Sequence, residues 1–303
     1  MRCGAKTWTV NLPLLTLENY VKKEYFINIK MMVNLMYNLI SVDDLLRDGK
    51  EFKVIEVSYN QSSYLDWHIP GAIMLPWRYL RHPVIRDFAP KEILEKNLGS
   101  LGISADDFLV LYSDFGNRYA FYAFWVLRAF GHKNLAVLNG GKAVWEAKDL
   151  PRESEVRRSS PVNYEAKDPD WSDRVTVWEL LLKIRSGEKF QLLDVRYWEE
   201  YSGETGTSPE HPNEESQTLG HIPGAVNIPW NKFFDPVTEE LIPPDKLQIS
   251  IPKEDTVVYC RTGARASVVW YYLKFLMGFP KVRLYDGSWS EWGNMVGVPV
   301  EVS

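Results

Sequence analysis

The pentapeptide HIPGA occurs twice in the chain, at residues 68–72 and again at residues 221–225. Each copy leads within a few residues to the dipeptide Pro-Trp, at 76–77 and at 229–230. Similar apolar segments flank both copies, and a glycine followed by four residues and a tryptophan closes each one. Because the repeat has the length of an ordinary domain, the chain is predicted to consist of two copies of one structural unit.

Short apolar runs rich in β-branched residues alternate with amphipathic stretches in both copies. The predicted strands are residues 54–57, 109–112 and 136–138, and in the second copy 192–195, 256–259 and 282–285. The clearest predicted helices are residues 90–98, 119–130 and 264–277. Alternation of this kind favours parallel strands covered by helices on both faces. We therefore predict an α/β chain of two tandem domains, each with a mainly parallel sheet flanked by helices.

The domain boundaries follow from where this pattern stops. We expect the first domain at residues 39–151 and the second at residues 172–303. Residues 152–171 contain Pro, Arg and Ser without an apolar period, so we interpret them as a linker. Residues 1–38 match neither copy, and we expect an N-terminal extension there that is either disordered or the product of an upstream start codon.

Composition argues against several classes of protein. The 303 residues carry a formal net charge of -5, without the basic balance of a nucleic-acid-binding protein. No apolar run reaches the ~20 residues that a membrane span needs. The two cysteines, Cys3 and Cys260, are far apart and the five histidines are scattered, so we expect neither a disulfide nor a metal site. Without an export signal, the cytoplasm is the expected location.

Cys260 directly follows the predicted strand 256–259 and stands just before the predicted helix 264–277. Ligands of open α/β sheets bind at this carboxyl end of the strands. A glycine inside the loop lets successive N–H groups point inward, where they favour an anion. Nearby arginines would lower the pKa of a thiol and raise its nucleophilicity. The residues predicted to bind the substrate here are Arg261, Thr262, Gly263, Ala264 and Arg265.

The first copy provides an internal comparison. Its equivalent loop begins at Ser113, where the second copy has Cys260, and it retains Gly116 and Arg118. Asp114 stands where the second copy has an arginine. A serine beside a carboxylate is poorly suited to carry sulfur or attract an anion, so we predict that the first domain is catalytically silent.

These features together resemble the tandem rhodaneses over residues 39–303. The pattern Cys-Arg-x-Gly-x-Arg-x-Ser at 260–267 and the segment YDGSW at 285–289 are similar to the thiosulfate sulfurtransferases of bacteria and archaea. The resemblance implies that Cys260 takes sulfane sulfur from thiosulfate as a persulfide and passes it to a thiol, or to cyanide in an assay. It implies no cofactor and no metal, and a monomer is compatible with a chain that supplies both domains.

The family's site residues carry over only in part. Cys260 matches the catalytic cysteine, and Arg261 matches the arginine of the thiosulfate-using branch, where the mercaptopyruvate-using branch has Gly-Ser instead of Arg-Thr. Asp194 and Arg196 match an Asp-x-Arg element near the active loop. Animal enzymes bind the substrate with a further arginine, at a position where this chain has Glu200. We hypothesise that Arg265 replaces it.

Three alternatives stay open at this point. 3-Mercaptopyruvate is the main alternative donor, and a non-enzymatic sulfur- or oxyanion-binding module is an alternative of another class. Phosphatases with a Cys-x5-Arg loop place the arginine where this chain has Ala266, so that loop would be one residue too short here. His221 and His68 occur in both copies, active and silent, which favours a structural role over acid–base catalysis.

Overall fold

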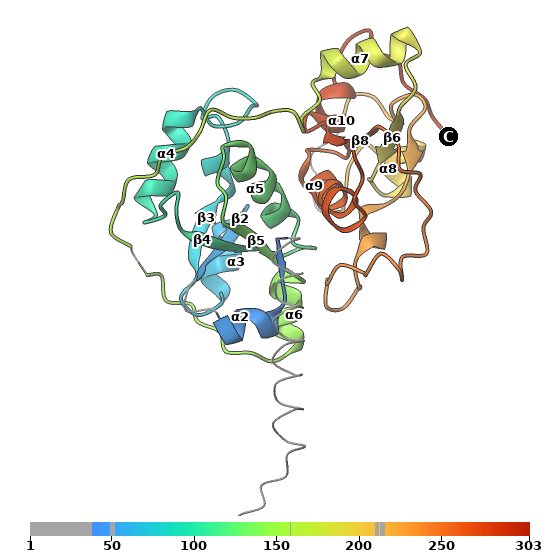
Figure 1. Ribbon diagram of the computed structural model, residues 1–303. Coiled ribbons are helices and arrows are strands. Elements are labelled where there is room, and N and C mark those ends of the chain that lie inside the picture. The colour runs from blue at the N-terminus through green and yellow to red at the C-terminus, as the bar shows by residue number, and fades with distance from the viewer. Residues whose placement is uncertain (1–37, 49–51, 158, 210–211, 213–215) are drawn as a thin grey trace, which may run out of the picture.

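The protein is described by a computed structural model that covers residues 38–48, 52–157, 159–209, 212 and 216–303. Two α/β bodies lie side by side and an extended segment joins them (Figure 1). Most of the extension expected at residues 1–38 lies outside the described residues. The exact domain boundaries expected from the sequence stay predictions.

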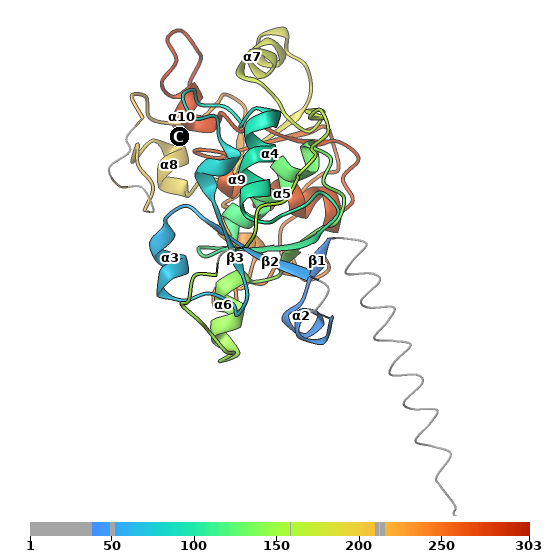
Figure 2. The ribbon, with the colours of Figure 1, turned by 90° about the vertical axis from the view of Figure 1, so that its left-hand side faces the viewer.

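The first sheet has five strands in the order β1-β5-β4-β2-β3, and every neighbouring pair is parallel. Its strands are β1 (Leu39–Ile40), β2 (Phe52–Ser58), β3 (Ile73–Pro76), β4 (Phe108–Tyr112) and β5 (Leu135–Leu138). Its helices are α2 (Val42–Asp48), α3 (Gln61–Asp66), η2 (Trp77–Leu80), α4 (Lys91–Ser100), α5 (Arg118–Ala129) and α6 (Gly141–Ala147). Figure 2 shows α4 and α5 on one side of the sheet and α2 and α6 on the other.

The second sheet has four parallel strands in the order β7-β6-β8-β9. Its strands are β6 (Gln191–Asp194), β7 (Val226–Asn227), β8 (Thr256–Tyr259) and β9 (Val282–Leu284). Its helices are α7 (Val177–Ser186), α8 (Trp198–Ser202), η3 (Trp230–Phe233), α9 (Ala264–Tyr271) and α10 (Ser288–Trp292). The predicted α/β class and the predicted strands are confirmed. The strands could be predicted because central strands such as β8 are buried along their whole length and therefore appear in the sequence as continuous apolar runs.

One predicted helix differs in its second half. The helix expected over residues 264–277 is α-helical only as far as Tyr271, and residues Tyr272–Leu276 form a π-helical turn, η4. At its end the Met277 N–H donates to the carbonyl of Tyr272, five residues back, at 3.0 Å. Residue spacing alone does not distinguish a π turn from an α turn, since the apolar period changes little over five residues.

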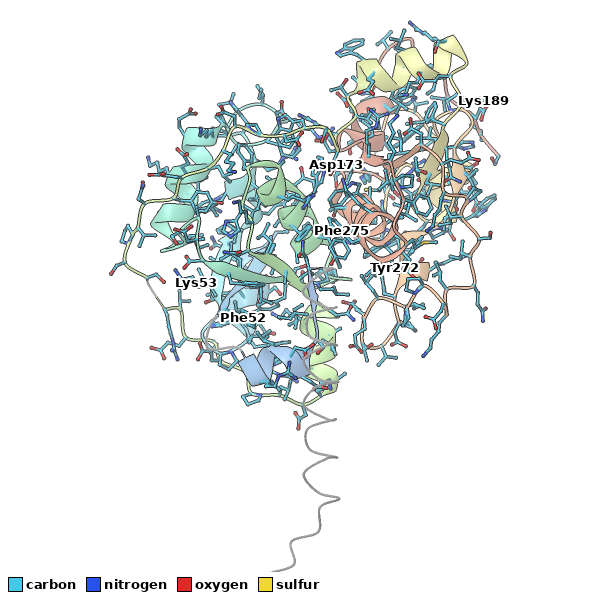
Figure 3. All side chains as sticks on the ribbon, viewed as in Figure 1. Phe52, Lys53, Asp173, Lys189, Tyr272 and Phe275 are labelled. Atoms are coloured by element: carbon cyan, nitrogen blue, oxygen red, sulfur yellow. The ribbon has the colours of Figure 1, made fainter. Side chains whose placement is uncertain are left out.

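Helix α5 is apolar on almost its whole circumference, and among its residues only Arg128 is exposed. A helix of this kind must be covered on two sides. One side faces the first sheet, and the other packs against α9 of the second domain (Figures 1 and 2). Phe124 lies in this seam with its ring centroid 5.2 Å from that of Tyr271 and 5.7 Å from that of Phe275. Figure 3 shows Phe275 between the two bodies, and one hydrophobic core runs through both domains.

Residues 152–157 and 159–171 run along the first domain, and these described residues form no helix and no strand beyond an isolated bridge at Glu153 (Figure 1). Backbone hydrogen bonds fasten this segment. The Val162 N–H donates to Gly99 at the end of α4 at 2.9 Å, and the Asp170 N–H donates to Ala129 at the end of α5 at 2.8 Å. The latter bond satisfies a carbonyl that the helix end leaves without an intrahelical partner.

Candidate active site

Cys260 lies between β8 and α9, and its side chain is buried with 1% of its surface exposed. The loop turns back on itself at Gly263, whose φ of +91° lies in the region that other residues rarely adopt. In this conformation the Gly263 N–H donates to the Cys260 sulfur at 3.2 Å. A backbone N–H directed at this position can donate to negative charge held there, including that of a persulfide.

Helix α10 supports this loop from one side. The Ser288 hydroxyl accepts a hydrogen bond from the Cys260 N–H at 3.2 Å and donates to the carbonyl of Tyr285 at 2.8 Å. The Trp289 N–H donates to the Cys260 carbonyl at 3.0 Å, and the Ser290 hydroxyl donates to the Arg261 carbonyl at 2.6 Å. Residues 288–290, at the end of the YDGSW segment and just after it, therefore fix the backbone of the loop. The sequence pattern alone did not define this role.

A narrow cavity of about 10 Å³ opens beside the cysteine loop, with room for about one water molecule. Four of its lining residues belong to the predicted site, namely Arg261, Thr262, Ala264 and Arg265. The others are Ser208, from a polar insertion that the second copy has before its HIPGA (residues 203–219), and Arg118 and Tyr119 from the first domain. Three arginines surround the cavity, so an anion that enters meets positive charge from both domains.

Arg265 also has an acidic partner. Its two terminal nitrogens contact the two carboxylate oxygens of Glu200 at 2.6 and 2.9 Å, and both side chains are buried. Part of its positive charge is therefore balanced by a carboxylate. Arg261 donates to the carbonyl of Gly206 at 2.7 Å, and this hydrogen bond ties the insertion to the cysteine loop. Arg265 thus contacts Glu200 as one half of an ion pair, and its replacement of the substrate-binding arginine stays a hypothesis.

Asp194 and Arg196 do not line the cavity. They form a fully buried ion pair with a closest N···O distance of 2.5 Å, and Arg196 also donates to the carbonyl of Gly220 at 2.8 Å, next to the HIPGA turn. The Tyr259 hydroxyl accepts from the Ile222 N–H in the same turn at 3.1 Å. Burial raises the pKa of Tyr259 well above its usual range, and the negative charge of Asp194 adds to this effect. The pair braces the turn behind the loop, and substrate contact by these two residues stays a prediction.

The two histidines have equivalent structural roles. The Nδ1 atom of His68 faces the carbonyl of Tyr64 at 2.8 Å, and that of His221 faces the carbonyl of Tyr201 at 2.9 Å. The imidazole of His68 stacks on the ring of Tyr64, and that of His221 stacks on the ring of Tyr201, with ring centroids 3.8 and 3.7 Å apart. The pattern is the same in both copies and points to packing.

The repeated tryptophans likewise belong to the cores. Trp145 packs in the core on the α2 and α6 side of the first sheet, and Trp292 packs in the corresponding core of the second domain. Trp230 is buried at the domain junction, where an added Cβ on Gly116 would lie 2.4 Å from its ring. It is therefore part of the contact with the silent loop, although it does not line the cavity beside Cys260.

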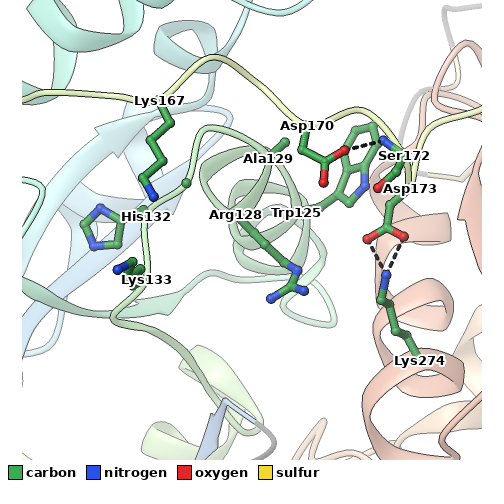
Figure 4. A pocket seen from close by; sticks show the side chains of 11 residues that line it. Trp125, Arg128, Ala129, His132, Lys133, Lys167, Asp170, Ser172, Asp173 and Lys274 are labelled. Atoms are coloured by element: carbon green, nitrogen blue, oxygen red, sulfur yellow. Dashed lines mark hydrogen bonds and ion pairs between the residues drawn. The ribbon is translucent and has the colours of Figure 1, made fainter.

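A larger cavity, of about 410 Å³, lies beside the C-terminal end of α5 and beside η4 (Figure 4). Arg128, Lys133 and Lys167 contribute positive charge there, while Lys274 is paired with Asp173. None of the predicted site residues lines it. In the described part of the chain, no group of three or more His, Cys, Asp or Glu side chains is arranged to hold a metal ion, and no helix has the length and apolar character to span a bilayer.

Sequence reasoning did not identify Arg118, Tyr119 and Ser208 as cavity residues. Arg118 had a recognisable signal, because the repeat aligns it with Arg265. Its approach to the second domain depends on how α5 packs against α9, which a linear pattern does not encode. Ser208 lies in an insertion without periodicity and carried no signal.

Comparison with known proteins agrees with this architecture. A family model for the rhodanese-like domain matches residues 41–148 and 177–295. The chain is 43% identical over 269 residues to a Thermus thermophilus protein named sulfur carrier protein TtuD, which covers 86% of this chain and 93% of that protein. It is 38% identical over 261 residues to the thiosulfate sulfurtransferase of Corynebacterium glutamicum, which covers 82% and 84%.

Solved structures show the same arrangement. The anaerobic ergothioneine biosynthesis enzyme from Chlorobium limicola, in complex with trimethyl histidine, superposes with a TM-score of 0.75 at 26% identity. The match covers 88% of this chain and 70% of that one. Together with the two matches of the family model, these similarities establish that the chain belongs to the rhodanese family and contains two rhodanese-like domains.

Proposed function

We propose that this chain is a thiosulfate sulfurtransferase that carries sulfur as a persulfide on Cys260. The observation that carries the proposal is the Gly263 N–H directed at the Cys260 sulfur at 3.2 Å, beside a cavity lined by three arginines. Relatives named as sulfurtransferases support a reaction with small sulfur donors and acceptors. Arg261 supports thiosulfate as the donor, since it matches the thiosulfate-using branch in the resemblance described above.

The proposed reaction has two half-steps. The Cys260 thiolate attacks the outer sulfur of thiosulfate, a new S–S bond forms, and the S–S bond of thiosulfate breaks so that sulfite leaves with the electron pair. The acceptor, a thiolate or cyanide, then attacks the outer persulfide sulfur and the Cys260 thiolate is released. The Gly263 N–H and the arginines stabilise the negative charge on sulfur and on the donor.

The direct test is thiocyanate formation from cyanide, with thiosulfate and separately with 3-mercaptopyruvate. Wild type is expected to prefer thiosulfate, and Cys260→Ser is expected to lose turnover while its thermal unfolding stays the same. Cys3→Ser, at the other cysteine of the chain, is the matched control and is expected to keep full turnover. A preference for 3-mercaptopyruvate would mean that this compound, not thiosulfate, is the donor. Turnover by Cys260→Ser would contradict the persulfide mechanism.

A second candidate concerns the acceptor. The Thermus thermophilus relative is named a sulfur carrier protein, which supports a persulfide that is passed on to a biological acceptor. Mass spectrometry of the Cys260 peptide after thiosulfate treatment, followed by addition of a thiol, tests this point. The persulfide is expected to persist without acceptor and to disappear when the thiol is added.

A further inference from the structure

The silent loop of the first domain holds a carboxylate supplied by the second domain. Gly116 aligns with Gly263 in the repeat, although the N-cap residue of α5 is Asn117 whereas that of α9 is Gly263 itself. The Gly263 N–H donates to the Cys260 sulfur at 3.2 Å, whereas the Gly116 N–H donates to Glu239 Oε2 at 2.7 Å. The silent loop has lost the cysteine but retains an N–H directed at a group that carries negative charge.

Glu239 is presented by an ordered turn. The Asp235 carboxylate accepts hydrogen bonds from the N–H groups of Val237 at 2.8 Å and Thr238 at 2.9 Å, and the Asp235 N–H donates to the Glu240 carbonyl at 2.9 Å. Glu239 itself has φ of +53°, a conformation that residues with a Cβ seldom adopt. This backbone directs its side chain toward the first domain.

The turn is also docked by a neighbouring contact. The Leu241 N–H donates to the side-chain oxygen of Asn139 at 2.8 Å, so a second hydrogen bond joins the two domains beside the first. Burial raises the pKa of Glu239, the Gly116 N–H lowers it, and the nearby Asp114 and Arg118 charges oppose each other. Glu239 is half-buried, and its carboxyl group belongs to the domain contact.

The silent loop leads directly into the cavity beside Cys260. Two residues after Gly116 the chain reaches Arg118 and Tyr119, the first-domain residues that line that cavity. The Ser267 hydroxyl lies 3.4 Å from the Arg118 carbonyl, at the junction of α5 and α9. A shift of the silent loop would therefore move one wall of the candidate active site.

We propose that the loop at residues 113–117 is a carboxylate-binding site that Glu239 fills within the same chain, and that this contact positions Arg118 and Tyr119 over the Cys260 cavity. Glu239 is thus a positioning residue. The contact does not depend on the sulfur chemistry. Only its effect on donor binding rests on the function proposed above.

The test measures the rate at which iodoacetamide alkylates Cys260, followed by mass spectrometry of the Cys260 peptide so that Cys3 does not contribute. Glu239→Ala is expected to raise this rate about tenfold, the effect of losing one hydrogen bond to a charged group. Added acetate should restore the slow rate, because it replaces the missing carboxylate. Glu240→Ala, one residue away and without a side-chain contact to the loop, is the matched control and should behave as wild type.

Two outcomes would overturn the proposal. An unchanged rate in Glu239→Ala would mean that the contact does not position the cavity wall, and an increase that acetate does not reverse would mean that the loop is no carboxylate site. Glu239→Gln keeps an oxygen acceptor for the Gly116 N–H, so it should react more slowly than Glu239→Ala. The reverse order would contradict the proposal even if Glu239→Ala folds poorly.

A kinetic measurement separates this proposal from the proposed function. In a chain that uses thiosulfate, Glu239→Ala is expected to raise KM for thiosulfate more than it lowers kcat, since Arg118 lines the cavity beside the cysteine loop. If wild type transfers no sulfur at all, the proposed function fails, while the alkylation rates and their response to acetate still decide the role of Glu239.

Discussion

Arg265 and Glu200 form a buried ion pair with two N···O contacts, at 2.6 and 2.9 Å, between the start of α9 and helix α8. In the resemblance to animal enzymes, position 200 carries a substrate-binding arginine. Here position 200, in α8, carries a carboxylate instead, and the guanidinium comes from Arg265 at the start of α9. The pair fixes Arg265 at the wall of the cavity and reduces the net positive charge there.

Glu200→Gln removes this counter-charge from a buried guanidinium. We expect the free energy of unfolding to fall by about 3 kcal/mol, as for other broken buried pairs. Urea denaturation measures the change. Asp168→Asn, which removes an exposed partner of Lys91, is the control and should leave stability unchanged. Equal effects in the two variants would show that the buried pair contributes no more than a surface pair.

Gly263→Ala should impair the sulfur site. An added Cβ would lie 3.2 Å from the backbone of Asp286 on a residue with φ of +91°, so the loop is strained and we expect its N–H to move relative to the sulfur. Loss of this hydrogen bond is expected to lower kcat/KM for thiosulfate about tenfold.

Gly187→Ala is the control for backbone strain alone. Gly187 has φ of +67° and no atom within 4 Å of an added Cβ, and it lies at the end of α7. Both variants should lose about 1–2 kcal/mol of stability, because each forces an alanine into left-handed backbone. Only Gly263→Ala should lose activity, and an equal loss in both would contradict the role of the Gly263 N–H.

Phe124→Ala opens the aromatic seam between the domains. Phe124 is fully buried and contacts the rings of Tyr271 and Phe275. The free energy of unfolding should fall by about 3–5 kcal/mol. Because one core serves both domains, near- and far-ultraviolet circular dichroism should report a single unfolding transition in wild type. Two separate transitions in wild type would contradict a shared core.

His132 should make stability depend on pH. Its Nε2 atom faces the Asp107 carbonyl at 3.0 Å and its Nδ1 atom faces the Tyr164 hydroxyl at 2.9 Å. Burial lowers the pKa of His132 below its usual 6.5, so the folded chain prefers the neutral ring. Below pH 6.5 the unfolded chain therefore binds more protons than the folded chain. The stability that the neutral His132 ring contributes above pH 6.5 is lost as the pH falls toward the lower pKa of the folded chain.

His132→Gln should reduce this dependence. Urea denaturation of wild type and variant, at one pH above 6.5 and one below, isolates the histidine as the difference between their two slopes. Wild type should lose more stability than the variant on acidification. Parallel curves would show that His132 does not titrate as its burial indicates.

The strands and the cysteine loop could be predicted from the sequence better than the side-chain contacts between elements. Strands such as β4 and β8 could be predicted because both of their faces are buried, while β1 and β7, with two residues each, carried too little pattern to be predicted. Cys260 and its loop could be located because strand, glycine and helix follow one another directly along the chain. The pairing of Arg265 with Glu200 joins residues far apart in sequence and depends on how α8 lies against the loop.

The domain contacts were equally inaccessible. Arg118 was visible only as an equivalent of Arg265, and its place beside Cys260 requires the packing of α5 against α9. Glu239 stands in a turn without apolar period, so nothing in the local pattern distinguishes it from Glu240. These contacts arise between elements, where side-chain shape and backbone direction decide the partner.

The aromatic seam between α5 and α9 also bears on why the silent copy is retained. If the second domain were produced alone, Trp270, Tyr271 and Phe275 would face water on the side now covered by α5. An apolar patch of this kind promotes self-association. By covering this patch, the first domain would keep the second from associating with itself, a contribution that does not depend on a cysteine at position 113.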